Sequence, residues 1–89
     1  MKKFELGRLL ITPGAITVVE LFRIDVLELL ARHQSGDWSE MDEADIEANT
    51  QNLEDGSQIF SSYTINGVKI WVITEADRSA TTILLPSEY

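Results

Sequence analysis

The sequence has no cysteine, only two prolines and a single histidine. Without cysteine the chain can form no disulfide and offers no thiolate as a nucleophile or as a zinc ligand. Long apolar runs are missing too, because the longest one near the N-terminus, Leu9 to Ile11, is far too short for a signal peptide or a spanning helix. We therefore expect a cytoplasmic protein that binds no metal and no other cofactor.

The length and composition are those of one ordinary globular domain. The 89 residues are enough for one domain and too few for two. The chain is 44% hydrophobic and 25% charged, with a mean hydropathy of -0.04, which does not suit a disordered or fibrous protein. We expect a single domain over residues 1–89.

Positive charge is absent from the middle of the chain. No Lys or Arg occurs from His33 to Val68, and the acids in that stretch account for the whole net charge of -8. Such a surface repels nucleic acid, so direct nucleic-acid binding is not expected. It could dock a basic protein partner, with Glu43 and Glu47 as an i, i+4 pair, or it could mimic DNA phosphates. The simplest interpretation is a solvated helix face.

Three helices are predicted in the first two thirds of the chain. Their start signals are Thr12-Pro13, then Asp25 with Glu28 as a capping pair, then Ser39 or Asp42. Gly36 and Gly56 are expected to end the second and third helices. The second helix has a broad apolar stripe that includes Leu27, whereas the narrow apolar face of the third predicts a peripheral position.

From Gln58 onward the pattern alternates as in strands. Asn66-Gly67 between two β-rich runs predicts a type I′ hairpin in which Tyr63 lies opposite Ile70. A third run, residues 81–85, ends at Pro86, which suits an edge strand. The predicted fold class is α+β, with two to three N-terminal helices packed on a three-stranded antiparallel β-meander at the C-terminus. The helices should cover the sheet face that carries Tyr63, Ile70, Val72 and Ile83.

The first candidate site is the segment from Arg32 to Trp38. His33 closes a helix, where the dipole favours its cationic form, and Gly36 lets Asp37 and Trp38 turn back toward it. A histidine beside an aspartate could act as a general base. The alternative is structural: a capping histidine, a turn aspartate and a tryptophan that anchors the helix to the sheet.

The second candidate site is the loop that follows Trp71. Its seven polar or charged residues are Thr74, Glu75, Asp77, Arg78, Ser79, Thr81 and Thr82. Arg78 could attract an anionic group, or it could simply pair with Asp77. Because Trp38 needs apolar cover near the end of the sheet, we expect this loop and the segment from Arg32 to Trp38 to come together.

Several strings of the sequence together resemble a known family. They are Leu6-Gly-Arg8, Thr12-Pro-Gly-Ala15, Leu30-Ala-Arg-His33, Ser35-Gly-Asp-Trp38, Trp71-Val-Ile-Thr-Glu-Ala-Asp-Arg-Ser79, Thr81-Thr-Ile-Leu-Leu-Pro86 and Glu88-Tyr89. Together they resemble a family of short proteins of bacterial plasmids and integrated mobile elements, usually called plasmid-related proteins. The resemblance covers almost the whole chain and implies an accessory role on a mobile element, without established biochemistry.

Three functional hypotheses follow. The leading one is a non-catalytic accessory protein that binds a protein partner through its acidic helix and the Trp71 face of its sheet. The second is a small metal-independent ribonuclease or toxin-like enzyme, similar in architecture to the barnase and colicin fold, in which His33 would be the base, Arg78 would steady phosphate and Tyr63 or Thr82 would orient the substrate. The third is a DNA mimic that opposes a host defence enzyme. The candidate binding residues are Arg32, His33, Asp37, Trp38, Trp71, Glu75, Asp77, Arg78, Ser79, Glu43 and Glu47.

Overall fold

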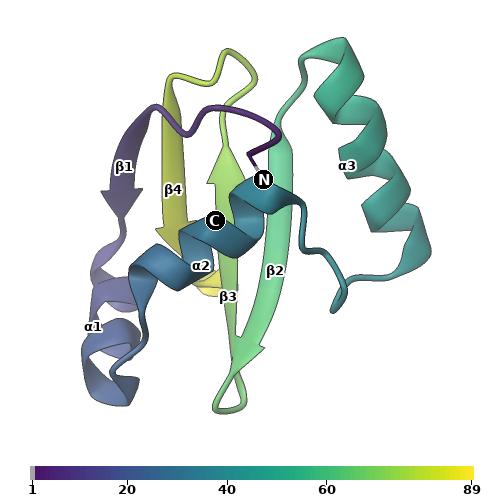
Figure 1. Cartoon of the computed structure of the whole chain (residues 1–89). Coiled ribbons are helices and arrows are strands. Elements are labelled where there is room, and N and C mark those ends of the chain that lie inside the picture. The colour runs from purple at the N-terminus through teal and green to yellow at the C-terminus, as the bar shows by residue number, and fades with distance from the viewer. Residues whose placement is uncertain (1) are drawn as a thin grey trace.

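A short strand precedes the helices in the computed structural model, which describes residues 2–89 (Figure 1). This strand, β1 (Arg8–Ile11), is followed by α1 (Pro13–Phe22), α2 (Val26–Ser35) and α3 (Glu43–Asp55). The strands β2 (Ile59–Ile65), β3 (Val68–Thr74) and β4 (Ala80–Leu84) come next, and a 3-10 helix (Pro86–Glu88) ends the chain. The four strands form one sheet in the order β1-β4-β3-β2.

The three helices begin at predicted start signals, the third at Asp42, and α2 and α3 end at the predicted glycines. Side-chain oxygens of Thr12, Asp25 and Asp42 accept hydrogen bonds from N–H groups in the first turns of α1, α2 and α3. Gly36 and Gly56 end α2 and α3 with φ of 79° and 78°, the left-handed region that glycine enters most easily. Within residues 2–89, no helix is long and apolar enough to cross a membrane.

The predicted hairpin register is confirmed. Tyr63 pairs with Ile70 across β2 and β3, and the turn residues Asn66 and Gly67 have φ of 50° and 77°, as a type I′ turn requires. The antiparallel pairing of β3 with β4 also has the expected register, with Val72 opposite Ile83.

The prediction of a three-stranded antiparallel meander is wrong, because the sheet is four-stranded and mixed. Strand β1 pairs in parallel with β4, from Arg8 opposite Ala80 to Ile11 opposite Ile83. The β4 strand is therefore internal, and Pro86 begins the 3-10 helix instead of marking a sheet edge. A four-residue strand shows too little alternation to be recognised, and a parallel partner far along the chain leaves no hairpin turn in the sequence.

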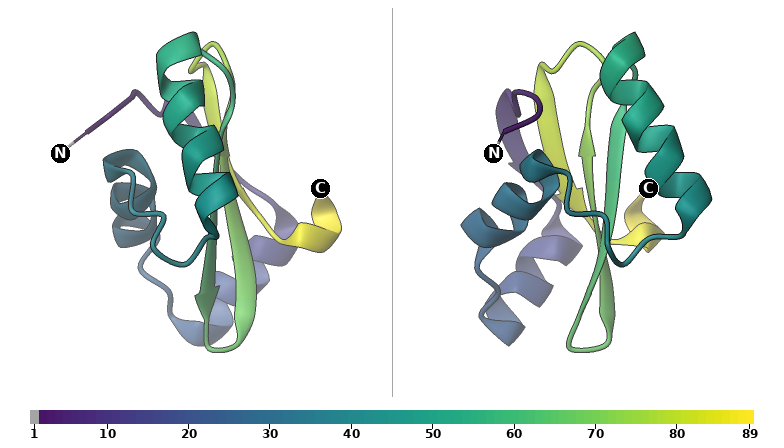
Figure 2. Two further views of the ribbon diagram at one scale, coloured as in Figure 1. Left: turned by 90° about the vertical axis from the view of Figure 1, so that its right-hand side faces the viewer. Right: turned by 45° about the vertical axis from the view of Figure 1, so that its right-hand side comes forward.

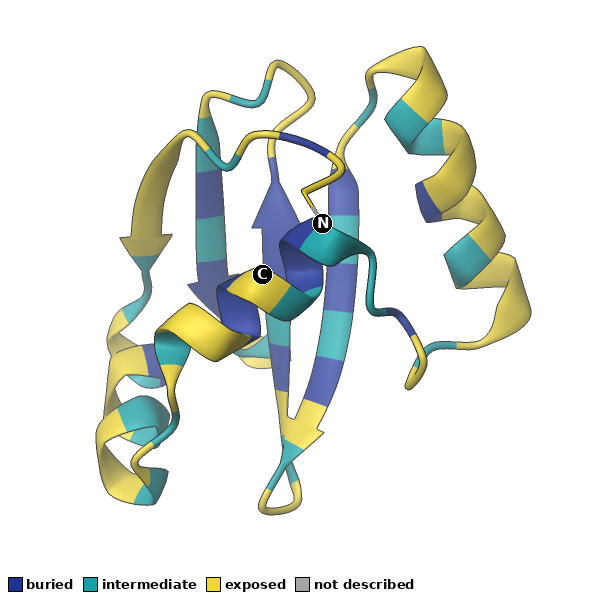
Figure 3. Ribbon diagram, in the orientation of Figure 1, coloured by how far each residue is buried: buried dark blue, intermediate teal, exposed yellow. Residues whose placement is uncertain are grey.

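Helix α2 covers one face of the sheet, and the C-terminal end lies on the other side (Figure 2). The core on the α2 side is built from buried side chains of α1, α2 and three strands: Ala15, Leu29, Leu30, Tyr63, Ile70, Val72 and Ile83. This confirms the face predicted to receive the helices, and Figure 3 shows the buried residues along it. Leu27 is an exception to the predicted stripe, since it turns outward and is 75% exposed.

Helix α3 stands beside the outer strand β2, as its narrow apolar face predicts (Figure 1). Its half-buried Ile46 and Leu53 pack against a second cluster made of Phe4, Trp38 and Ile59. The predicted role of Trp38 as an anchor is therefore confirmed, since its side chain is buried between the segment after α2 and the sheet.

The N-terminal segment passes so close to the β3–β4 loop that only glycine fits at residue 7. Gly7 has φ of 67°, and a Cβ placed on it would lie 2.4 Å from the carbonyl oxygen of Arg78 and 2.5 Å from the carbonyl carbon of Ser79. The next residue, Arg8, donates its N–H to the Ser79 oxygen at 2.9 Å. This contact fixes the entry of the chain into β1.

We predict that Gly7→Ala lowers the free energy of unfolding more than Gly56→Ala does. Both glycines have positive φ, which costs an L-residue about 1–2 kcal/mol. Only Gly7 would add a clash with backbone, because nothing lies within 4 Å of a Cβ at Gly56. Urea unfolding of both variants measures the difference, and equal losses would contradict the close approach.

Candidate functional site

His33 lies at the centre of a buried polar network. Its imidazole is fully buried, with Nδ1 2.5 Å from the Ser61 Oγ on β2 and Nε2 2.8 Å from the Thr74 Oγ1 on β3. The indole Nε1 of Trp38 donates to the same Ser61 hydroxyl at 2.8 Å. The Phe4 ring lies edge-on to the imidazole, with ring centroids 5.1 Å apart.

The network continues from Thr74 to the N-terminal segment. The hydroxyls of Thr74 and Thr81 lie 2.7 Å apart, and Thr81 donates to the backbone oxygen of Leu6 at 2.7 Å. Thr81 is therefore an acceptor for Thr74, which in turn accepts from the Nε2–H of His33. These hydrogen bonds form one continuous network that connects α2, β2, β3, β4 and the segment before β1.

The directions of these hydrogen bonds also indicate the protonation state of His33. Ser61 accepts from Trp38, and among the described residues Nδ1 is the one acceptor within reach of the Ser61 hydroxyl hydrogen, so the satisfied network leaves Nδ1 without a proton. Burial agrees with this, since it lowers the pKa of His33 from 6.5 to about 3. The expectation that the helix dipole would favour a cationic His33 is wrong, because desolvation outweighs the dipole at this buried position.

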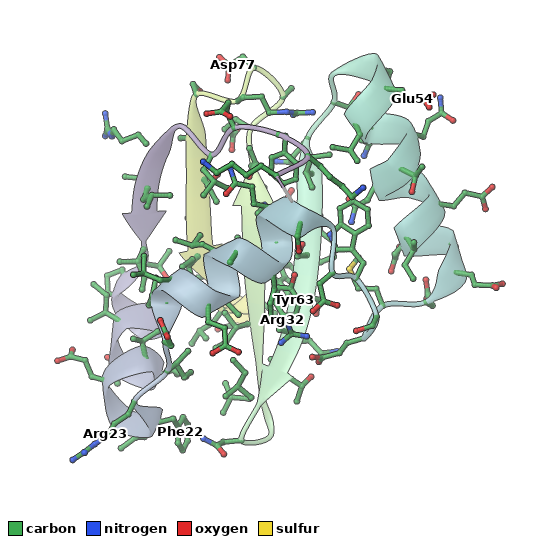
Figure 4. All side chains as sticks on the ribbon, viewed as in Figure 1. Phe22, Arg23, Arg32, Glu54, Tyr63 and Asp77 are labelled. Carbon is green, nitrogen blue, oxygen red and sulfur yellow. The ribbon has the colours of Figure 1, made fainter. Side chains whose placement is uncertain are left out.

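A second group of contacts surrounds Arg32. Its guanidinium pairs with Asp37 at 2.7 Å and with Glu40 at 3.0 Å, and it lies 4.3 Å above the centre of the Tyr63 ring (Figure 4). The hydrogen bond from Arg32 lowers the pKa of Asp37, and burial raises the pKa of Tyr63 to about 12. Tyr63 donates its hydroxyl to the Asp37 backbone oxygen at 2.8 Å. Asp37 is thus held at two points, by Arg32 through its carboxylate and by Tyr63 through its backbone oxygen.

Arg78 serves the backbone of the loop instead of pairing with Asp77. Its guanidinium donates to the carbonyl oxygens of Ser57, at 2.7 Å, and of Glu75 and Ala76, both at 3.1 Å. Asp77 accepts from the Ser79 N–H, and these two residues and Glu75 are exposed. Figure 4 shows Asp77 at the end of this loop. The residues therefore shape a turn, and the alternative pairing of Arg78 with Asp77 is not formed.

The two predicted segments do come together, as expected. The Phe4 ring contacts the His33 imidazole, and the Arg78 guanidinium carbon lies 5.7 Å from the same ring's centre. His33 has no exposed surface, however, and Thr82 lies on the opposite face of the sheet from Thr81 and Tyr63. The candidate catalytic residues His33, Arg78, Tyr63 and Thr82 are thus not assembled around one solvent-accessible point.

The open face of the sheet carries a groove that the sequence did not delimit. We call it the acidic-aromatic groove; it measures about 370 Å³ and is lined by Glu40, Met41, Asp42, Asp45, Phe60, Ser62, Lys69 and Trp71. The rings of Phe60 and Trp71 form one wall, edge to face at 5.0 Å, and Tyr89 lies against the far side of Trp71 at 5.7 Å. The segment before α3 and the first turn of that helix supply the opposite wall, and the lining as a whole holds three carboxylates and one ammonium.

Sequence patterns identify only part of this groove. The hairpin register places Phe60, Ser62, Lys69 and Trp71 on one face, so the sheet wall could have been found. Glu43 and Glu47, the predicted docking pair on α3, are exposed and lie outside the lining, where Asp42 and Asp45 stand instead. Within the described chain, no group of three His, Cys, Asp or Glu side chains is placed to hold a metal ion.

Comparisons with protein-family models, with curated proteins and with solved structures find no match for this chain.

We predict that the fold loses stability between pH 6.5 and pH 3 through His33. The unfolded chain takes up a proton near pH 6.5, whereas the folded chain resists protonation down to about pH 3. The free energy of unfolding should therefore fall by about 1.4 kcal/mol per pH unit from this residue as the pH drops through that window.

Urea unfolding at pH 7.5, 6.5 and 5.5 measures the loss, with His33→Gln as the variant that lacks the titration. NMR gives a direct check, because His33 is the single histidine and its ring signals are unambiguous. An imidazole that titrates near pH 6.5 in the folded protein would contradict the assignment.

Proposed function

We propose that this protein is a non-catalytic binding module that holds a Lys- or Arg-bearing segment of a basic partner protein in the acidic-aromatic groove. The observation that carries this proposal is that the groove has an aromatic wall and, across from it, a wall of carboxylates. Phe60 and Trp71 offer aromatic faces for a cation, and the carboxylates of Asp42 and Asp45 lie across from them. A cationic side chain with an aliphatic stem matches both walls.

The carboxylates of the groove differ in how many hydrogen bonds they already accept within the protein. Glu40 is committed, because it accepts from the Arg32 guanidinium and from the Thr64 N–H at 2.8 Å. Asp42 accepts one hydrogen bond, from the Asp45 N–H that it caps. Among the described residues, the Asp45 side chain has no hydrogen-bond or ion-pair partner. Asp45 and Asp42 are therefore the groups with capacity left for a ligand.

No specific observation favours the other hypotheses to the same degree. The ribonuclease hypothesis needs a base in contact with substrate, and His33 is enclosed and neutral. The DNA-mimic hypothesis needs rows of carboxylates at duplex spacing, whereas only five of the eight acids from Asp37 to Asp55 stand on α3, a helix of 13 residues. Both hypotheses stay predictions, as does the accessory role on a mobile element that the family resemblance implies.

The first test compares two double variants of α3 that remove the same charge. Asp42→Asn with Asp45→Asn empties the groove of its free carboxylates and keeps a capping side chain at residue 42. Glu43→Gln with Glu47→Gln removes two charges outside the groove. Binding of a fluorescein-labelled octalysine peptide is followed by fluorescence anisotropy at physiological salt, where exposed charges are screened over ~8 Å.

We predict about tenfold weaker binding for the groove double variant, which corresponds to about 1.4 kcal/mol, and little change for the control pair. Equal weakening by both pairs would show general attraction to the net charge of -8 and would contradict a groove site. Unchanged binding in both would contradict the acidic part of the proposal altogether.

The second test concerns the aromatic wall. Trp71→Leu keeps an apolar side chain but removes the aromatic face, whereas Trp71→Phe keeps a smaller one. A cation–π contact of about 1 kcal/mol predicts roughly fivefold weaker peptide binding for Trp71→Leu, with Trp71→Phe in between. If Trp71→Leu binds octalysine as well as the wild type does, the aromatic wall has no part in binding.

A further inference from the structure

The two edges of the sheet differ in whether side chains occupy their outward-facing backbone groups. On the outer edge of β2, Asn49 of α3 acts like a neighbouring strand, because its amide donates to the Phe60 oxygen at 2.5 Å and accepts from the Phe60 N–H at 3.0 Å. The Thr64 N–H on the same edge donates to Glu40 at 2.8 Å. Side chains thus occupy this edge and block the addition of a further strand.

The outer edge of β1 has no such cover among the described residues. Arg8 donates its N–H to Ser79 at 2.9 Å and Thr12 donates to Ile83 at 3.0 Å, so these alternate residues face β4. Leu9 and Ile11 therefore direct their N–H and C=O groups away from the sheet. β1 lies at the open side of the sheet in Figure 1, with no other strand or helix along it.

Apolar side chains surround this free edge. Leu9 is 51% exposed and Leu10 is 40% exposed. Leu9 and Ile11 share a hollow of about 170 Å³ with Val26 and Leu30 of α2. Leu10 lies on the opposite face of the strand. Free backbone groups beside apolar surface suit an added β-strand.

We propose that the occupant of this edge is β1 of a second copy, paired antiparallel about a two-fold axis at Leu10. In that register Leu9 of one chain exchanges backbone hydrogen bonds with Ile11 of the other, and Leu10 faces its own counterpart. The two sheets then join into one continuous sheet. The proposal is independent of the acidic-aromatic groove, which lies toward β2.

Charge favours a second copy at this edge. The chain has a net charge of -8, yet no acid occurs between Glu5 and Glu20, so the two paired β1 strands bring no acid of their own to the axis. Glu88 accepts hydrogen bonds from Thr12 and from the Gly14 N–H at the end of the strand. The single base of the strand, Arg8, falls opposite Thr12 in the proposed register. This edge is thus a place where two acidic molecules can approach with little repulsion.

The test is analytical ultracentrifugation of the full chain over a range of concentrations. The wild type should form a dimer, and Leu10→Lys and Leu10→Glu should each be monomeric, because like charges meet at the axis. A mixture of the two variants should regain a dimer of one chain each. Leu21→Lys is the control, since Leu21 is 70% exposed on α1 and outside the proposed interface.

Circular dichroism melts confirm that each variant is folded, and the mixture keeps the test decisive if the single variants lose some stability. A wild type that stays monomeric at every concentration overturns the proposal. So does a Leu21→Lys variant that dissociates as readily as Leu10→Lys. A monomeric wild type whose Leu9 and Ile11 amide signals shift with a synthetic peptide of residues 5–12 would assign the edge to a foreign strand, and would equally overturn a second copy.

Discussion

The neutral imidazole of His33 joins α2 to β2 through Ser61 and to β3 through Thr74, and the hydrogen bonds run on through Thr81 to the oxygen of Leu6. The hydroxyls of Ser61, Thr74 and Thr81 each donate one hydrogen bond and accept one. Among the described residues, no buried side-chain nitrogen or oxygen lacks a hydrogen-bond partner. A buried network of this kind stabilises a fold only when every member is satisfied. A proton on Nδ1 would leave the Ser61 hydroxyl without an acceptor, so the network and the uncharged state of His33 require each other.

The position of α2 also determines where the groove lies. Because His33 faces the sheet, Arg32 emerges at its side and pairs with Asp37 and Glu40 in the segment that leads to α3. Glu40 in turn accepts from the Thr64 N–H, which ties that segment to the edge of β2. The first residues of α3 are thereby brought over the open face of the hairpin, opposite Trp71. The groove thus depends on packing that takes place on the other face of the sheet.

Local sequence patterns predicted the three helices and the strands β2, β3 and β4, whereas they gave no access to β1 or to contacts between distant segments. Asp25 and Gly36 mark the ends of α2 because caps act within one turn, and Asn66-Gly67 sets the hairpin register because a two-residue turn leaves few alternatives. Nothing near β1 in the sequence indicates a partner close to the other end of the chain, so its parallel pairing with β4 was missed. Only the sheet wall of the groove could be predicted, because the other wall comes from a separate segment of the chain. Strand alternation places Trp71, but helical periodicity alone does not tell whether Glu43 or Asp45 faces it.

The distribution of charge and of free backbone groups follows from this topology. Helix α3 and the segment before it lie between α2 and β2 along the chain, so Asn49 of the helix and Glu40 of the segment reach the β2 edge and occupy the backbone groups of an exposed strand. The β1 edge receives no such helix, because α1 turns away from the strand that precedes it (Figure 1). The uncompensated acids of residues 37–55 consequently lie toward the β2 edge of the sheet, and the unpaired strand edge lies at β1. If two copies join at β1 about the two-fold axis at Leu10, their grooves lie on the same face of the joined sheet, toward its two far edges. A basic partner that spans both grooves would bind more tightly because the second groove is held at a raised local concentration, without any additional contact.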